Sequence, residues 1–530
     1  MCGCAGWKEP GGDGKNPRIT AKDTLFVQRN IKTDFGICLP YGMGGRQDGN
    51  CRRNCRQKKN RKKRGKEMST TLVGILGFLT IVGIVVTLFK SKTLPSIAFI
   101  VFPMILACIL VAGGYYDVEQ IGKLIKGGFG STGPTAALFV FSVLYFGIMT
   151  DAGMFDVIIG KLMKLVGDNV IGVTVMTAII ALIGHLDGGG ASTFLIVIPS
   201  MLPVYKKMHM RPTTLLRVAV LAMGVLNLMP WAGPTMRAAS VLGMESGALW
   251  HTIMPIQAFG IVLCLAHAVL AGVQEKARGA GLHGKLAQEE GEVAVEEKKN
   301  ELGDLARPKL FLFNIALTVA VIAMLIWDQF PSYVPFMVGV AIAILVNYTD
   351  IKMQKKIINS HAGPALMMCS TLMGAAVLMG ILVYGFNDKG AAAIAKPGVE
   401  MQIQSVVSCM ANLITVILPA SIGQHLPLVI GFLSVPLALA FDTDSYFYGM
   451  LPIMMAIGAS FGVEALPIAV AMVVCRNCAT FISPMVPATL LGIGLADVEI
   501  KDHLKASFLY VWGFSILCMI TAVTTGIMPL

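Results

Sequence analysis

Apolar stretches of about 20 residues recur from Thr70 to the end of the chain, with short polar breaks between them. A helix needs roughly 20 consecutive apolar residues to cross the core of a bilayer, so this pattern predicts transmembrane helices. Only 14% of the 530 residues are charged, against about 25% in soluble domains, which excludes a soluble globular protein. We therefore expect an all-α polytopic membrane protein with about 11 or 12 transmembrane helices.

Two segments, 170–205 and 424–461, have a different pattern. Each consists of an apolar arm, a tip that contains Gly or Asp, and a second apolar arm, which is typical of a re-entrant hairpin. Backbone of this kind is tolerated at membrane depth only where protein or a cavity surrounds it. Prolines interrupt two further spans, 213–243 and 463–495. The uninterrupted candidate spans are 70–89, 94–113, 133–150, 250–273, 308–326, 332–349, 363–385, 403–421 and 506–527.

The first 67 residues differ from the rest of the chain. They hold 17 Lys or Arg and 6 Asp or Glu, so nearly all of the net charge of +12 lies here. Such a basic run can bind nucleic acid or anionic lipid, but the five cysteines are poorly spaced for zinc. Lys, Arg, Glu and Gly can all be written in purine-only codons. This stretch can therefore be untranslated sequence that contains a purine-rich ribosome-binding site. We therefore expect residues 1–67 to be a basic disordered leader upstream of the true start, Met68, and expect no nucleic-acid partner.

The longest hydrophilic segment of the remaining chain is 274–307, which mixes both signs of charge. It separates an N-terminal half, 68–273, from a C-terminal half, 308–530. Basic residues in short loops mark the cytoplasmic side of membrane proteins. Together with the basic residues of two other loops, this segment indicates the cytoplasmic side, so we expect 274–307 to be a cytoplasmic linker. The residues of those loops are Lys206, Lys207, Arg211, Lys352, Lys355 and Lys356.

An internal repeat relates the two halves. Ser-x-Phe-x4-Pro occurs at 192–199 and again at 445–452, an offset of 253 residues, and the same offset carries Pro234 onto Pro487. A weaker echo links GPTAALF at Gly133 with GPALMM at Gly363. A hairpin followed by a broken helix, present twice, is typical of secondary transporters with inverted repeats. We expect each half to be a transport repeat with one hairpin and one broken helix.

The first hairpin tip reads GHLDGGGAST over 184–193. Consecutive glycines permit left-handed backbone and close approach, so the amides of a glycine run beside hydroxyls can surround a carboxylate. The alternative is an ordinary flexible turn between helices. The candidate binding residues here are Gly188, Gly189, Gly190, Ser192 and Thr193.

The first broken helix reads NLMPWAGPTMR over 227–237. A helix interrupted inside the membrane exposes amide groups and a positive dipole end, which together hold an anion. Arg237 can make a bidentate contact with a carboxylate, unless it extends to a membrane interface instead. The candidate binding residues are Asn227, Pro234, Thr235 and Arg237.

The second hairpin tip, FDTDSYFYG over 441–449, places Asp442 and Asp444 two residues apart in apolar sequence. Carboxylates in such a setting are costly unless they hold a cation or a proton, and a hard divalent cation prefers such oxygens. In a surface turn they would be ordinary aspartates. We expect a cation site at Asp442 and Asp444, with Asp187 of the first tip as a further ligand.

The second broken helix, CRNCATFISPMVPAT over 475–489, mirrors the first. Its C-x2-C has no second pair, which favours packing over metal binding. Histidines titrate near neutral pH, so His185 and His425 near the hairpins are candidates for proton coupling, although a single His in a span is commonly structural. The remaining candidate binding residues are Ser445, Asn477, Ser483 and Thr489.

At these four motifs the chain closely resembles the citrate–metal complex:proton symporter family (CitMHS) of the ion transporter superfamily. The resemblance rests on LDGGGASTF, PWAGPTMRAAS, DTDSYFYGMLP and SPMVPATLLGIGL, and it covers about residues 69–530. It implies a bacterial inner-membrane carrier that takes up citrate complexed with magnesium or calcium, driven by protons, with no permanently bound cofactor. It implies that the two tips and two breaks form the substrate site. The expected mechanism is alternating access, and a homodimer is an expected assembly. The family commonly has G-D-G at the first tip and W-G-G at the first break, where this chain has D-G-G-G and W-A-G.

Other functions stay open at this point. The nearest is a proton- or sodium-coupled carrier of another organic anion, such as a dicarboxylate or gluconate. A channel would pass ion current without saturable, proton-coupled flux. An intramembrane aspartyl protease needs two carboxylates that share a proton, and its G-x-G-D signature is absent. Because H-E-x-x-H and Walker motifs are also absent, we expect no enzyme.

Overall fold

The computed structural model describes residues 68–90, 93–165, 167–282, 305–394, 401–416 and 418–529. Within these ranges the protein is nearly all helical, with nineteen α-helices and one small sheet. The predicted leader, 1–67, and most of the predicted linker, 274–307, lie outside the described residues. Their predicted roles therefore stay predictions.

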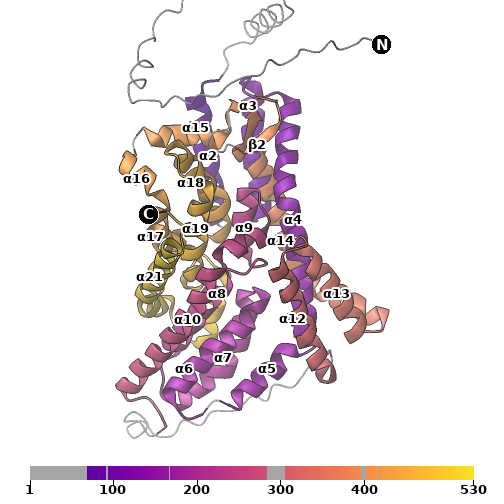
Figure 1. The fold of residues 1–530 in the computed structure, drawn as a ribbon, viewed down its shortest axis with the longest axis vertical. Coiled ribbons are helices and arrows are strands. Elements are labelled where there is room, and N and C mark those ends of the chain that lie inside the picture. Colours follow the sequence, from indigo (N-terminus) through magenta and orange to yellow (C-terminus); the bar gives the residue numbers. More distant parts are fainter. Residues whose placement is uncertain are drawn as a thin grey trace, which may run out of the picture. The chain divides into compact units, whose positions relative to one another are not determined.

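The first half folds as a series of nine helices (Figure 1). Two helices precede a long helix of 34 residues, a short helix follows, and then come a hairpin, a broken helix and another long helix. The nine are α2 (Thr70–Phe89), α3 (Pro95–Ala112), α4 (Val118–Asp151), α5 (Met154–Met163), α6 (Val170–Gly184), α7 (Gly190–Lys207), α8 (Pro212–Leu226), α9 (Gly233–Leu242) and α10 (Ser246–Arg278).

The second half repeats this order, which confirms the internal repeat and extends it over the whole described chain. Its long third helix has 33 residues, and its fourth has 10, as in the first half. The nine matching helices are α12 (Phe311–Trp327), α13 (Tyr333–Asn347), α14 (Ile351–Val383), α15 (Val406–Thr415), α17 (Leu426–Ala440), α18 (Leu451–Ser460), α19 (Ala465–Cys478), α20 (Pro487–Ala496) and α21 (Ile500–Thr524). Gly133 and Gly363, the weaker sequence echo, lie inside the matching helices α4 and α14.

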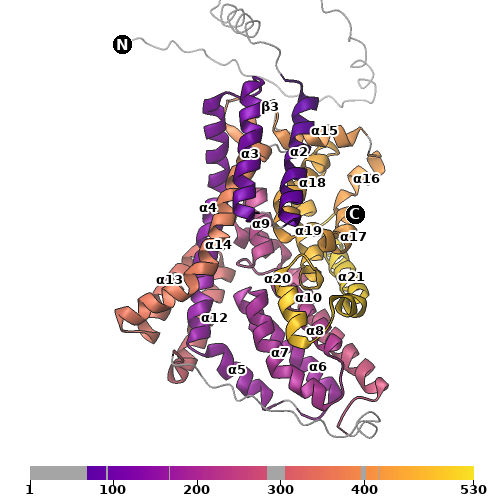
Figure 2. The ribbon, with the colours of Figure 1, turned by 180° about the vertical axis from the view of Figure 1, so that it is seen from behind.

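The two hairpins enter from opposite ends. Figures 1 and 2 show α6 and α7 at the end where α5 lies, whereas α18 lies at the other end beside α15. The two broken helices, α8–α9 and α19–α20, lie between them and pack against each other. The repeat is therefore inverted, as the sequence predicts.

Eight helices in the described residues are long and apolar enough to cross a bilayer, and one of these, α6 with its 3-10 extension, is a hairpin arm. Six further apolar helices have 10–17 residues. If the two broken helices and α13 are counted as spans and the hairpin arm is not, the described residues hold 10 spans, and the predicted 11 is reached only when the hairpin arm is counted as well. Helices α4 and α14 are longer than the predicted 133–150 and 363–385.

The candidate span 403–421 was wrong. This stretch folds into α15 and a five-residue helix, α16 (Ala420–Gln424), neither of which can cross a membrane. Before α15, three short strands form an antiparallel sheet in the order β2-β1-β3. The strands β1 (Tyr384–Asn387), β2 (Ala392–Ile394) and β3 (Met401–Ile403) are a small departure from the expected all-helical chain.

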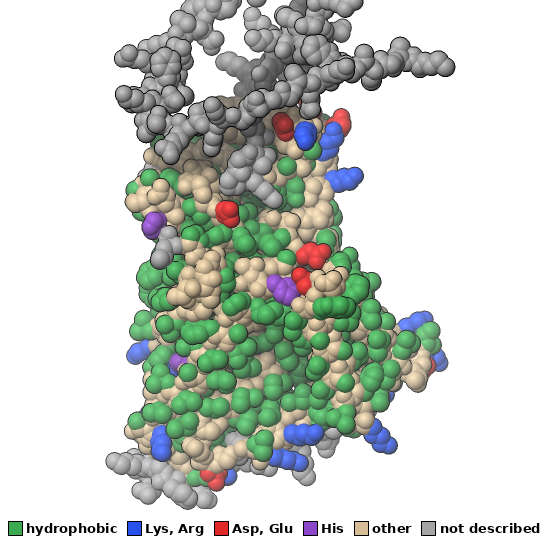
Figure 3. Space-filling model, viewed as in Figure 1, with side chains coloured by type: hydrophobic (Ala, Val, Ile, Leu, Met, Phe, Trp, Pro, Cys, Tyr) green, Lys and Arg blue, Asp and Glu red, His purple; other side chains and the backbone are tan. Residues whose placement is uncertain are grey.

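Apolar side chains cover much of the surface. Figure 3 shows them across most of the visible face, with Lys and Arg mainly toward its ends. Leu79, Val262, Leu312 and Leu509 are each at least 60% exposed. In water this surface would aggregate, but in a bilayer it faces lipid chains. The chain is therefore a multi-pass membrane protein.

The two long helices α4 and α14 pack together at two glycines. A Cβ atom on Gly128 would collide with the carbonyl oxygen of Ala376, and one on Gly380 would lie 2.6 Å from the carbonyl oxygen of Leu124. Small residues let helix backbones approach closely in membranes, where there is little hydrophobic force between helices. Because α4 and α14 belong to different halves, this contact joins the two repeats.

We expect Gly128→Ala to lower the melting temperature of the purified protein by several degrees, because overpacking of this kind costs roughly 1–3 kcal/mol. Gly130→Ala is the matched control, because Gly130 is exposed in the same helix and a Cβ atom there meets no neighbour within 4 Å. Thermal unfolding in detergent, followed by intrinsic fluorescence, measures both. An unchanged melting temperature for Gly128→Ala would contradict the close contact.

Candidate functional site

The first hairpin turns through a 3-10 helix, η2 (His185–Asp187), and Gly188, whose φ of 70° is left-handed. Asp187 holds this turn together. Its Oδ1 accepts a hydrogen bond from the backbone N–H of Gly189 at 2.7 Å, and its Oδ2 accepts one from the hydroxyl of Ser192. Both carboxylate oxygens are thus used within the tip, so Asp187 braces the turn.

His185 lies at the same tip and is fully buried. Its Nδ1 is 2.6 Å from Oγ1 of Thr193, and its Nε2 is 3.1 Å from Oδ1 of Asn227 at the first break. Both ring nitrogens therefore have a partner. The imidazole ties the first hairpin to the first broken helix.

The first broken helix ends its α8 half at Leu226 and resumes at Gly233. Pro234 in the first turn of α9 has no N–H to leave unsatisfied, so it fits a helix start. The carbonyl of Asn227 accepts two hydrogen bonds, from the hydroxyl of Thr235 at 3.0 Å and from Nδ2 of Asn477 at 3.1 Å. The second bond comes from the other repeat, so Asn227 connects both breaks.

The indole of Trp231, also in this break, donates from Nε1 to the carbonyl of Leu186 at 2.7 Å. This bond fixes the break against the first tip. Trp231 is not among the predicted site residues, although its place within PWAGPT is a signal, because a buried tryptophan needs a partner for its N–H.

The second hairpin tip continues into a π-helix, η4 (Ser445–Met450). Oδ2 of Asp442 accepts hydrogen bonds from the N–H groups of Asp444 at 2.9 Å and Ser445 at 3.2 Å. The carboxylate of Asp444 contacts the guanidinium of Arg237, with Oδ1 2.5 Å from Nε. The Arg237 side chain is 8% exposed and that of Asp444 14%, so this is a buried ion pair between the two repeats.

The second break also supports the second hairpin. The Ser483 hydroxyl donates to the carbonyl of Ala438 at 2.6 Å, and Arg476 reaches the carbonyl of Phe441 at 3.5 Å. Arg476 is fully buried, and its guanidinium also contacts the Thr480 hydroxyl and the ring of Tyr446. Arg476 was noted in the sequence motif but was not among the predicted binding residues.

The first tip also packs against the second break. A Cβ atom on Gly190 would collide with the ring of Phe481 and lie 3.0 Å from Cβ of Ala488. A Cβ atom on Gly188 would lie 3.7 Å from Cα of Ala232 in the first break. Each break is therefore in contact with both hairpins, and the four predicted motifs meet.

Several buried polar atoms in these motifs have no hydrogen-bond partner among the described residues. They are Oγ of Ser445, the hydroxyl of Tyr448, Oδ1 of Asn477, Oγ1 of Thr489 and Nε of Arg476. Buried polar groups are normally satisfied, so an unsatisfied set calls for an explanation such as a ligand. Three of the five belong to predicted binding residues.

The structure does not bring His425 into this arrangement. His425 is exposed at the start of α17, and the 15 residues of that helix place it about 22 Å from the second tip. The described residues contain no group of three or more His, Cys, Asp or Glu that could hold a metal, so Asp187 is not grouped with Asp442 and Asp444. The remaining predicted site residues all lie at the two tips and two breaks.

Comparison with known proteins bears directly on these motifs. A family model described as "Citrate transporter" matches residues 67–475. The chain belongs to the CitMHS citrate transporter family. This confirms the resemblance seen in the sequence, and it makes the protein a transporter and not an enzyme.

Two relatives from Bacillus subtilis (strain 168) align along nearly their whole length. The chain is 32% identical over 459 residues to a "Citrate transporter", covering 86% of this chain and 99% of the relative. It is 30% identical over 454 residues to a "Mg(2+)/citrate complex secondary transporter", covering 85% and 98%. Among solved structures, the YdaH transporter of Alcanivorax borkumensis matches with a TM-score of 0.49 and 12% identity over 77% of this chain and 89% of that one, a likeness too slight to support an argument.

Gly190→Ala should lower citrate uptake by roughly tenfold or more, because the added methyl group displaces the first tip from the second break, and small displacements in a binding site are costly. Gly184→Ala is the matched control, since its Cβ atom would meet only ordinary contacts at 3.7 and 3.8 Å. Uptake of labelled citrate, normalised to protein in the membrane, measures both variants. Equal uptake by the two would show that the close packing of the first tip has no functional role.

Proposed function

We propose that this protein takes up citrate as a complex with a divalent cation, magnesium or calcium, together with protons, by alternating access across a bacterial inner membrane. Family membership supports citrate, and the relative named as a Mg(2+)/citrate complex transporter supports the cation. In this proposal the cation is part of the substrate, and the protein needs no resident cofactor. A homodimer, which the resemblance implies, stays a prediction.

The observation that carries the proposal is the buried pair of Arg237 and Asp444. A buried ion pair repays its desolvation only if each charge keeps a partner. A citrate–metal complex supplies both partners at once, because its carboxylates suit a guanidinium and its cation suits a carboxylate. We propose that the substrate enters by separating the pair, so that Arg237 binds a citrate carboxylate and Asp444 binds the cation.

The unpartnered polar atoms suit the rest of such a ligand. The hydroxyls of Ser445 and Thr489 can donate to citrate oxygens, and Oδ1 of Asn477 can accept from the citrate hydroxyl. These atoms come from the second tip and the second break. They therefore complete a site whose cation and carboxylate contacts come from both repeats.

The other two carboxylates have separate roles in this proposal. Asp442 uses one oxygen to hold the backbone of the second tip, which orients Asp444, and its other oxygen joins the cation. Asp187 keeps both oxygens on the first tip. We therefore assign Asp187 to bracing the turn and not to the cation.

The inverted hairpins support alternating access. Their tips meet at the breaks while their arms extend toward opposite ends, so each hairpin can close the site from its own side. The polar links between the repeats at this point are local: the pair Arg237–Asp444 and the bond from Asn477 to Asn227. Movement of one hairpin together with the broken helix of its own repeat therefore disturbs only these two of the polar contacts described above.

A carrier of another organic anion is the second candidate. Arg237 and the hydroxyls would serve a dicarboxylate equally well. The pair Asp442 and Asp444 argues against this, because two carboxylates would repel an anion that brings no cation. The discriminating property is whether uptake requires the metal.

Uptake of labelled citrate into proteoliposomes should depend on a divalent cation, and Asp444→Asn should abolish that uptake, because the amide is a poorer cation ligand and leaves Arg237 without its partner. Asp168→Asn is the control, since Asp168 is exposed in the loop before α6. A panel of magnesium, calcium, manganese and no metal, with an imposed pH gradient, gives the dependence. Equal uptake without metal in the wild type would favour the organic-anion carrier.

Proton coupling is assigned to His185 because its hydrogen bonds suit both protonation states. In the neutral state Nε2–H donates to Asn227 and Nδ1 accepts from the Thr193 hydroxyl. In the protonated state Nδ1–H donates to Oγ1 of Thr193, whose hydroxyl turns to the carbonyl of Gly189 at 2.8 Å. No heavy atom needs to move between the two states.

His185→Gln should therefore uncouple transport from protons: uptake driven by an imposed pH gradient falls to background, while exchange of external for internal metal-citrate continues. His425→Gln should behave as the wild type, because His425 is exposed and remote from the tips. Parallel gradient-driven and exchange assays separate the two activities. Full gradient-driven uptake by His185→Gln would remove His185 from the coupling path.

A further inference from the structure

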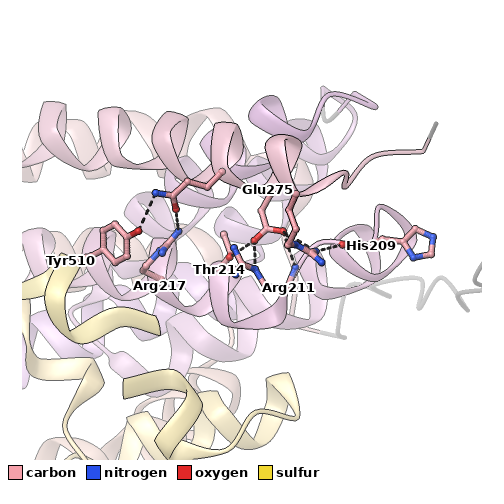
Figure 4. Close-up of polar contacts among 8 residues, drawn as sticks. His209, Arg211, Thr214, Arg217, Glu275 and Tyr510 are labelled. Atoms are coloured by element: carbon pink, nitrogen blue, oxygen red, sulfur yellow. Dashed lines mark hydrogen bonds and ion pairs between the residues drawn. The ribbon is translucent and has the colours of Figure 1, made fainter. Parts of the chain in front are cut away.

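A polar cluster outside the transport site joins the start of α8 to the end of α10. Figure 4 shows its centre, Glu275, which is fully buried. The carboxylate accepts from Nε of Arg211 at 2.7 Å, from the hydroxyl of Thr214 at 2.6 Å, and from Nε and Nη2 of Arg278 at 3.1 and 3.0 Å. Both oxygens of Glu275 are therefore occupied.

Arg217, also on α8, belongs to the same cluster but forms no ion pair with a carboxylate in the described residues. It is 5% exposed, its Nη2 donates to the side chain of Gln274 at 2.9 Å, and its guanidinium stacks on the ring of Tyr510 from α21, 4.1 Å from the centroid (Figure 4). Its Nε is buried and has no hydrogen-bond partner in the described part of the chain. An amide and an aromatic ring stabilise the cation but do not neutralise it.

Three arginines thus share one carboxylate in this cluster. A buried charge without a counter-ion is strongly unfavourable, so the cluster favours binding of an anion from outside the described residues. The side chains of Arg211 and Arg278 remain partly exposed, at 48% and 34%, and both are bound to the same Glu275 carboxylate. Planar guanidinium groups match the oxygens of a phosphate.

The surroundings indicate which phosphate. Tyr510 is 36% exposed, and its neighbour Leu509 on α21 is 72% exposed. On α10, Val273 and Leu270 are each 47% exposed beside Gln274. These apolar side chains face lipid, so the arginine cluster lies beside the bilayer and not beside an aqueous pocket. Basic groups between helices at a membrane surface are a recurring site for anionic lipid headgroups.

We propose that Arg217, with Arg211 and Arg278, binds the phosphate headgroup of an anionic phospholipid between α8, α10 and α21. The phosphate supplies the missing negative charge, and the acyl chains lie along the apolar faces of α10 and α21. The lipid thereby holds the start of the first broken helix against α10. This site is independent of the citrate site.

Thermal unfolding of the full-length protein in detergent tests the proposal. Added phosphatidylglycerol should raise the melting temperature of the wild type by about 3 °C or more, because a ligand that binds only the folded state stabilises it. Phosphatidylcholine should not do so. Inorganic phosphate at the same concentration distinguishes a free anion from a lipid, and a shift equal to that of phosphatidylglycerol would overturn the lipid assignment.

Arg217→Gln should abolish the shift caused by phosphatidylglycerol. Lys276→Gln is the matched control, because it removes one positive charge from the same end of α10 at an exposed position. An equal loss in both variants would show only general attraction to a basic surface and would overturn the site. If Arg217→Gln does not fold, Arg217→Lys keeps the charge but not the stacked plane, and a full shift in that variant would also count against the proposed contact.

Discussion

Backbone that breaks inside a membrane protein has to satisfy its own polar groups, because no water is present in the bilayer core to do so. The rest of the site depends on this constraint. The carbonyl of Asn227, freed where α8 ends, takes hydrogen bonds from Thr235 and from Asn477 of the other repeat. The carboxylates of Asp187 and Asp442 take the N–H groups freed at the two tips. Bonds within each tip and between the two breaks thus satisfy the backbone at the four interruptions.

The charged side chains of the site lie at these same interruptions. Arg237 and Asp444 lie at a break and a tip from different repeats, so their contact exists only when both repeats are in place. The same residues have the two chemistries that a metal-bound carboxylate ligand needs. In the mechanism that we propose, the site therefore remains neutral when empty and still recognises both parts of a charged complex, which limits the cost of exposing it during transport.

Much of the fold was predictable because its signals are local. Proline and glycine mark both breaks, and Asp beside a glycine run marks the first tip. The full length of α4 was missed because residues 118–132 are partly polar and look like a loop, although Ile121, Leu124 and Gly128 form a buried face of the helix. The pairing of Arg237 with Asp444 was not predictable, because the two residues are 207 positions apart and no local pattern links them. His425 is close to the second hairpin tip in sequence but not in space, because the 15 residues of α17 lie between them.

The glycine contact between α4 and α14 has a consequence for how the protein is made. The ribosome completes α4 before the second half exists, so the face that carries Gly128 has no native partner until α14 has been inserted. During that interval the first nine helices lack the surface against which their long helix packs. Close packing of the two long helices in the membrane is therefore a late event in synthesis.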